Sequence, residues 1–212
     1  SDGALNLGQN SVFEGHGNVM YLRNAKVDGD LNMSNSGGFL EVKDINVAGD
    51  ANLTTTVSAN PHVKHFIHVI GDSEVGGNMN IDSAHNIHIG NYDIQHQELL
   101  PGSLKVGGEL NAHATNGHVM VTIDTEADKI SLKSDNFNVL SDDKAVLKAN
   151  EYEFEANGYI GGLGGNGNST AANNIITVME NYQHLNNPAA RTYMNIAGGD
   201  IVKLKTPSTS SA

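Results

Sequence analysis

The acidic side chains near positions 30 and 153 are the residues best suited to chemistry, because carboxylate oxygens are the ligands that calcium prefers. Alternate residues of an extended strand share a face, so three glutamates in the run 151–155 would lie together. The candidate calcium ligands are Asp28, Asp30, Glu151, Glu153 and Glu155. No segment has the spacing of an EF-hand loop, so a solvated strand face is the alternative. We expect either no cofactor or calcium.

The 10 histidines form a second group of potential ligands. Neutral imidazole binds zinc, copper and nickel, and His62, His65 and His68 are closely spaced. On an extended strand His62 and His68 share one face while His65 lies on the other, so these three do not form a local ligand set. The alternative is that the histidines occupy polar strand faces and turns.

The sequence offers little for catalysis. It contains no G-x-S-x-G or H-E-x-x-H motif, and its two arginines are Arg23 and Arg191. The run 162–167 matches G-x-G-x-x-G, but no βαβ unit surrounds it and no suitably placed acidic residue follows, which favours a flexible hinge over a dinucleotide loop. We therefore expect no catalytic residues and no enzyme activity.

The elements that would position these side chains come from an internal repeat. The phrase V-x-G-[DNE]-apolar-N-apolar begins at Val27, Val47, Val75 and Val106, and a truncated form, Gly3-Ala4-Leu5-Asn6-Leu7, opens the chain. In an extended strand the valine and the two apolar residues share one face, so each copy is predicted to be one half-buried strand. The copies recur at steps of 20 to 31 residues, which is typical of stacked supersecondary units.

Stacked copies would form a β-solenoid with one phrase in each coil. The amides of Asn32, Asn52, Asn80 and Asn111 would then lie in register as a hydrogen-bonded Asn ladder. The alternative is a β-sandwich in which the Gly-Asp and Gly-Asn pairs mark turns before short strands. Both interpretations predict an all-β fold class.

The remaining chain divides by composition. From Val119 the apolar residues alternate in short runs, which predicts an antiparallel meander or further short coils and extends the β-rich repeat body over 1–156. A Gly-rich linker is expected at 157–168 and a helix-plus-strand appendage at 169–205. The helix is predicted from Ile175, Val178, Met179, Tyr182 and Leu185 at helical spacing. A disordered tail is expected at 206–212.

Composition limits the partners. The net charge of −12 and pI near 5.1 leave no broad basic surface for phosphates, so we expect no nucleic-acid binding. No apolar run is long enough to cross a bilayer, so no membrane insertion is expected. The start Ser1-Asp2-Gly3 suits a processed chain, which favours a secreted or cell-surface location.

The V-x-G-D-L-N phrases between Gly3 and Ala112 resemble those of repetitive β-helical proteins, namely filamentous-haemagglutinin-type adhesins and bactofilins. The resemblance implies an elongated molecule that assembles end to end or projects from a surface. The strands from Lys129–Ser134 to Tyr152–Ala156 are also similar to the short-strand repeats of phage tail spikes and needle proteins.

The first functional hypothesis is therefore a structural subunit of an extracellular filament, surface fibre or matrix, which self-assembles through strand edges or by donation of an N-terminal strand. The expected assembly strand is Gly3, Ala4, Leu5, Asn6 and Leu7, because it copies the internal phrase and carries no charge or Pro that would block an edge. The alternatives are a carbohydrate-binding adhesin or tail-fibre module, which the absence of Trp disfavours, and a β-helical carbohydrate-active enzyme.

Overall fold

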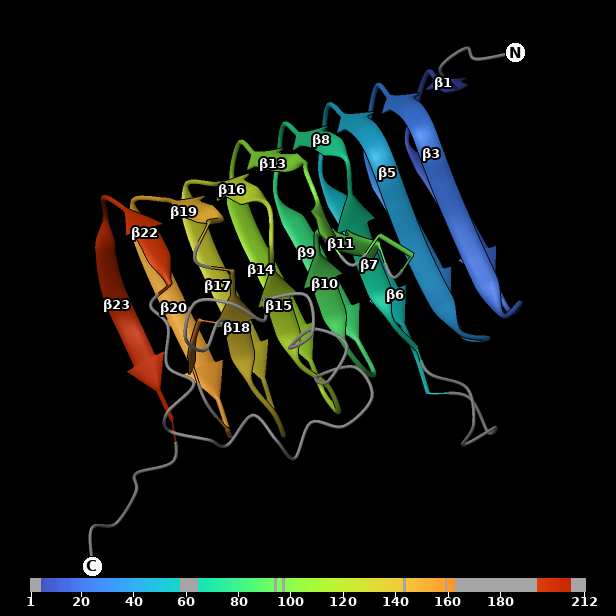
Figure 1. Cartoon of the computed structure of the whole chain (residues 1–212). Helices are drawn as coiled ribbons and strands as arrows, with labels where there is room; N and C mark the ends of the chain where they lie inside the picture. Colours follow the sequence, from blue (N-terminus) through green and yellow to red (C-terminus); the bar gives the residue numbers. More distant parts are fainter. Residues whose placement is uncertain are drawn as a thin grey trace, which may run out of the picture.

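The computed structural model describes residues 5–57, 65–93, 95–96, 98–142, 144–158, 160–162 and 194–206, and every regular element among them is a strand (Figure 1). Eight of these strands form one parallel sheet in sequence order. They are β2 (Ser11–Gly15), β4 (Leu31–Asn35), β6 (Ala51–Thr55), β9 (Met79–Ser83), β14 (Glu109–Ala114), β17 (Lys129–Ser134), β20 (Glu151–Ala156) and β23 (Asp200–Lys205). We call this the small sheet.

A second, 13-stranded sheet curls around the other side of the core and is here called the large sheet. It begins with β1 (Leu5–Leu7), β3 (Val19–Val27) and β5 (Phe39–Val47), and it divides into two arms after β5. The first arm contains β7 (Ile67–Ile70), β10 (Ile87–Ile89), β15 (Val119–Val121), β18 (Val139–Ser141) and β21 (Ile160–Gly162). The second arm contains β8 (Asp72–Val75), β13 (Ser103–Val106), β16 (Asp124–Glu126), β19 (Val146–Lys148) and β22 (Asn195–Ala197).

The chain passes repeatedly through the first arm, the second arm and the small sheet, and we call one such passage a circuit. Residues bonded between successive circuits lie 20, 28 and 31 residues apart. The longest of these circuits contains an antiparallel hairpin, β11 (Asn91–Asp93) with β12 (Glu98–Leu100), and register resumes after it. The uneven spacing of the phrases therefore arises from insertions between strands.

Each copy of the repeated phrase turns a corner, which corrects the prediction that each copy is one strand. Val27 ends β3 in the large sheet, and Leu31 begins β4 in the small sheet. Both side chains still point into the core: the four phrase valines and the apolar residues Leu31, Ala51, Met79 and Leu110 are at most 4% exposed. The prediction that these residues share a core is confirmed.

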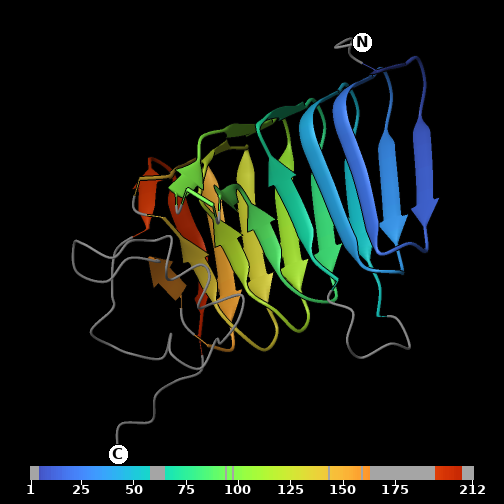
Figure 2. The same ribbon diagram turned by 45° about the vertical axis from the view of Figure 1, so that its right-hand side comes forward.

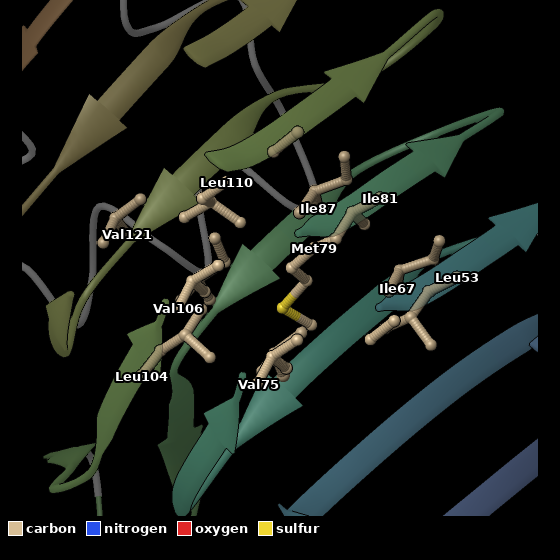
Figure 3. Close-up of a cluster of buried hydrophobic side chains, with 14 of the residues drawn as sticks. Leu53, Ile67, Val75, Met79, Ile81, Ile87, Leu104, Val106, Leu110 and Val121 are labelled. Atoms are coloured by element: carbon tan, nitrogen blue, oxygen red, sulfur yellow. The ribbon is translucent and has the colours of Figure 1, made fainter. Parts of the chain in front are cut away.

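The core is a single apolar cluster between the two sheets. Figure 3 shows Val75 and Val106 of the second arm, Ile67 and Ile87 of the first arm and Met79 of the small sheet pointing toward one another. In a parallel sheet each residue lies beside its equivalent in the next circuit. An apolar residue at the same position of every circuit therefore builds a continuous apolar column.

The predicted fold class, a β-solenoid or a β-sandwich of many short strands with one C-terminal helix, is wrong. The chain is all-β, but its sheets are parallel apart from β11–β12, so neither hairpins of a sandwich nor an antiparallel meander build the body. The large sheet is curled and divided. The long strands β3 and β5 each span both arms, whereas in later circuits two shorter strands, one in each arm, take the place of one long strand. A regular solenoid would instead keep one set of strands throughout.

The helix predicted from the apolar residues between Ile175 and Leu185 lies outside the described residues, and the part of the chain that the structure describes contains no helix. The last strand expected from the sequence is present as β23. Together with β22 it extends the two sheets by pairing with β20 and β19. Among the described residues there is no helix long and apolar enough to cross a membrane.

Candidate assembly site

The four asparagines of the repeated phrase form one row on the outer face of the small sheet. The Nδ2 of Asn52 donates to Oδ1 of Asn32 at 2.9 Å, and the Nδ2 of Asn80 donates to Oδ1 of Asn52 at 2.9 Å. Asn111 continues the row to Asn80 at 3.1 Å. Asn52 and Asn80 each donate to the previous circuit and accept from the next one, so the row links four strands of the sheet.

A second row, which was not predicted from the sequence, lies at the corner between the sheets. The Oδ1 of Asn10 accepts the backbone N–H of Asp30, and Oδ1 of Asp30 accepts the N–H of Asp50, both at 2.8 Å. In the same way, Oδ1 of Asp50 accepts the N–H of Asn78 at 2.8 Å, and Oδ1 of Asn78 accepts the N–H of Glu109 at 2.9 Å. The signal was the Asp or Asn after the phrase glycine, because only these short side chains place an oxygen there.

This row explains the glycine of the repeated phrase. A Cβ atom on Gly108 would lie 2.1 Å from Oδ1 of Asn78, and one on Gly49 would lie 2.1 Å from Oδ1 of Asp30. The row ends at Glu109. In the next circuit the residue equivalent to Gly108 is Asp128, which is not a glycine. The glycine is therefore present where the previous circuit supplies a short side-chain oxygen, and it is absent where the longer Glu109 precedes it.

Most of the predicted calcium ligands are engaged with other groups. Asp30 accepts the corner N–H, and Asp28 lies 3.4 Å from the Nζ of Lys26. Glu153 pairs with Lys129 at 2.9 Å, and Glu155 pairs with Lys203 at 2.9 Å. Glu151 is exposed on the same strand. In the ranges that the structure describes, no group of three or more His, Cys, Asp or Glu residues could hold a metal ion.

The charged side chains on the small sheet form a column with alternating sign. Lys133 of β17, Glu155 of β20 and Lys205 of β23 are register partners on successive strands. The Nζ of Lys205 lies 3.3 Å from Oε1 of Glu155. The hydrogen bond from Lys203 is the main reason that the pKa of Glu155 lies below its usual range, and Lys205 and Lys133 act in the same direction. We call these residues the charge column.

The described histidines of the first arm meet one another without forming a metal centre. Register places His68 of β7 beside His88 of β10, with ring centroids 5.4 Å apart. Burial lowers the pKa of His68 to about 4, and burial together with the charge of His68 places the pKa of His88 well below its usual value. His88 Nε2 is bonded to Oγ1 of Thr122 at 2.8 Å. Both rings are therefore held neutral near pH 7.

The two ends of the sheets differ from the middle because side chains at core positions are exposed there. Leu5 is 47% exposed at the N-terminal end, and Ile201 and Leu204 are 50% and 63% exposed at the C-terminal end. Their register partners in the adjoining circuit, Ala25, Tyr152 and Phe154, are buried. Figure 2 shows the first and last strands of the small sheet at opposite ends of the molecule.

The end strands also have one open edge each. Among the residues that the structure describes, β2 of the small sheet pairs only with β4 and β23 pairs only with β20, while every strand between them has a neighbour on both sides. The predicted assembly strand contributes β1: Leu5, Asn6 and Leu7 pair in parallel with Ala25, Lys26 and Val27 of their own chain. Gly3 and Ala4 lie outside the described residues. Each end therefore combines an open strand edge with exposed apolar side chains.

A shallow groove of about 350 Å³ lies over β13, β16 and β19 on the second arm. Its charged side chains include Lys105, Glu126 and Lys148, and Lys148 pairs with Glu126 at 3.1 Å. No aromatic side chain is among the described residues that line it, whereas sugar rings commonly stack on aromatic groups. A carbohydrate ligand stays a prediction from the sequence.

Comparisons of the chain with protein-family models, curated proteins and solved structures give no match. The interpretation of the site therefore rests on its geometry.

Proposed function

We propose that this protein is a structural subunit that associates with further copies of itself through the open ends of its two parallel sheets. The observation that carries the proposal is the exposure of Leu5, Ile201 and Leu204 at positions that are buried in the inner circuits. Burial of a leucine or isoleucine side chain contributes about 1.5–3 kcal/mol, so covering these residues gives a favourable free energy of association.

The open edges support the same proposal. Unpaired strand edges are templates for pairing with another chain, and proteins that must stay monomeric usually block them with charge, proline or a bulge. The strand β23 has one register irregularity, beside Tyr152 and Glu153, and its two lysines pair with Glu155 of the same chain. Its apolar side chains remain exposed. The strand β2 has an exposed Val12 and contains no proline or lysine. A second copy would satisfy the edge and the apolar side chains together.

The experiment compares the wild-type chain with the variant Ile201→Lys/Leu204→Lys. We expect the wild type to form larger species as its concentration rises, in sedimentation velocity and in negative-stain micrographs. The variant should remain monomeric, because two desolvated ammonium groups would oppose burial of that end.

The matched control is Val57→Lys, which replaces another exposed apolar side chain, 72% exposed, that belongs to no end strand. This control should assemble as the wild type does. A wild-type chain that stays monomeric at its highest soluble concentration would rule out the proposed function. Equal assembly of the wild type and the double variant would show that β23 is not in the interface.

A further inference from the structure

We infer that the association is head to tail: β22 and β23 of one copy pair in parallel with β1 and β2 of the next, and Lys205 lies beside Glu14 of that next copy. This inference rests on the proposed function and specifies its interface. The partner is therefore a second copy of this chain in one defined orientation.

Strand direction supports the orientation. The ladders of both sheets are parallel, and β2 and β23 are the first and last strands of the same sheet. A copy displaced along the stack, without inversion, brings β2 beside β23 in the same parallel arrangement. Joining two like ends requires a two-fold rotation that reverses either the strand direction or the inner and outer faces of one sheet, and the side-chain columns would then lose their register.

The side-chain columns continue across such a junction. Phe13 belongs to the column that runs through Met33 and ends at Leu204, so Leu204 would meet Phe13 of the next copy. Leu5 begins the column that ends at Ile196 of β22, so these two side chains would also meet. Phe13 and Ile196 are partly buried against the core already. The junction would thus extend the apolar core from one copy into the next.

The charge column supplies the third argument. It alternates as Lys133, Glu155 and Lys205. The same row of register partners runs back through His113, Asp82, Thr54 and Ser34 to its first member, Glu14. A head-to-tail junction therefore sets the exposed Glu14 carboxylate beside the exposed Lys205 ammonium. A junction between like ends would instead place two copies of Glu14, or two copies of Lys205, in one interface. Complementary charges fix register and orientation in interfaces, and like charges oppose the wrong pairing.

A head-to-tail junction uses two different surfaces, and each added copy exposes a fresh pair of ends. Such heterologous contacts generate open-ended filaments unless a rotation closes a ring. The expected product is accordingly a polar, unbranched filament with no fixed number of subunits. A junction between like ends would instead stop at a dimer.

The test exchanges the charges at the two ends. Glu14→Lys or Lys205→Glu alone should raise the concentration needed for assembly by about tenfold or more, because each places like charges at every junction. An equimolar mixture of the two single variants should assemble again, because each altered end then meets a complementary partner. The double variant Glu14→Lys/Lys205→Glu should assemble by itself for the same reason.

The controls are Glu74→Lys and Lys105→Glu, which make the same changes in net charge on exposed side chains of the second arm. They should assemble as the wild type does, and circular dichroism should show every variant folded. If the wild type assembles and both single variants do so equally well, the head-to-tail register is wrong while self-association stands. The same conclusion follows if the single variants fail and their mixture is not rescued. If the wild type itself does not assemble, the proposed function is wrong.

Discussion

At the residue scale, the corner glycines depend on the side chain one circuit earlier. The Cβ of an alanine at Gly108 would lie 2.1 Å from Oδ1 of Asn78 and 3.2 Å from Cγ of the same residue. The backbone oxygen of Gly77, also at 3.2 Å, is the next contact. Most of the steric conflict therefore comes from one side chain, so it can be removed by mutation.

We predict that Gly108→Ala lowers the free energy of unfolding by about 1–3 kcal/mol, since the inserted methyl group must displace Asn78. Asn78→Ala alone should cost about 1 kcal/mol, because the N–H of Glu109 loses its acceptor. The double variant should lose less unfolding free energy than the sum of the two single losses, and denaturant titration measures this coupling. Additive losses would show that Asn78 does not determine the glycine. Gly8→Ala is the control, since no atom lies within 4 Å of its Cβ position.

The repeat predicted which residues enter the core but not how the chain bends between them. Alternation places Val27, Leu31 and Met33 on one face whether the phrase is one strand or two strands joined at a corner, so periodicity could not distinguish these cases. The bend is determined by contacts between circuits, such as the bond from the N–H of Asp50 to Asp30. Partners so far apart in sequence leave no local pattern.

At the element scale, the neighbouring strands β7 and β10 bury two imidazoles that are neutral near pH 7. Their pKa values in the folded protein are lowered, that of His68 to about 4, whereas an unfolded chain would have values near 6.5. Below pH 6.5 the unfolded state therefore binds more protons than the folded state. The stabilisation is complete above pH 6.5 and is lost as the pH falls toward 4.

We predict that the free energy of unfolding decreases between pH 7 and pH 4, with a contribution of about 3 kcal/mol from His68. His68→Leu should reduce this dependence, whereas replacing the exposed His16 should not. Denaturant titrations at several pH values in this interval measure the slope. An unchanged slope in His68→Leu would contradict the assignment.

At the scale of the whole molecule, the circuits behave as separable units because each inner strand of the two large parallel sheets pairs with its equivalents one circuit before and one circuit after. This explains why the fold class was only partly predictable. The all-β class follows from composition and alternation, but the direction of pairing does not: β9 pairs with β6 and β14, which lie 28 and 31 residues away, rather than with a strand joined to it by a tight turn. The division of the large sheet after β5 likewise depends on positions that only the assembled circuits bring together.

The insertion between β10 and β13 tests this separability. Ile89 of β10 pairs with Val121 of β15, and Ser103 of β13 pairs with Asp124 of β16. In the later circuit only two residues, Thr122 and Ile123, connect Val121 to Asp124. Two residues, Gly90 and Gly102, should therefore be enough to connect β10 to β13 in the earlier circuit. Deleting residues 91–101, which include the hairpin β11–β12, should therefore leave both sheets in register.

We expect the shortened chain to fold with the same strand pairing and to lose about 1–3 kcal/mol, because the buried Tyr92 side chain is removed with the hairpin. Hydrogen exchange measures the outcome directly: the amides of β9, β10, β13 and β14 should keep their protection, since their bonds run to neighbouring circuits. A deletion of equal length across the corner at Gly107 and Gly108 is the control. It should abolish folding, because it removes the end of β13 and the beginning of β14. Loss of protection in β10 and β13 of the shortened chain would show that the hairpin holds the two arms together and that the circuits are not independent.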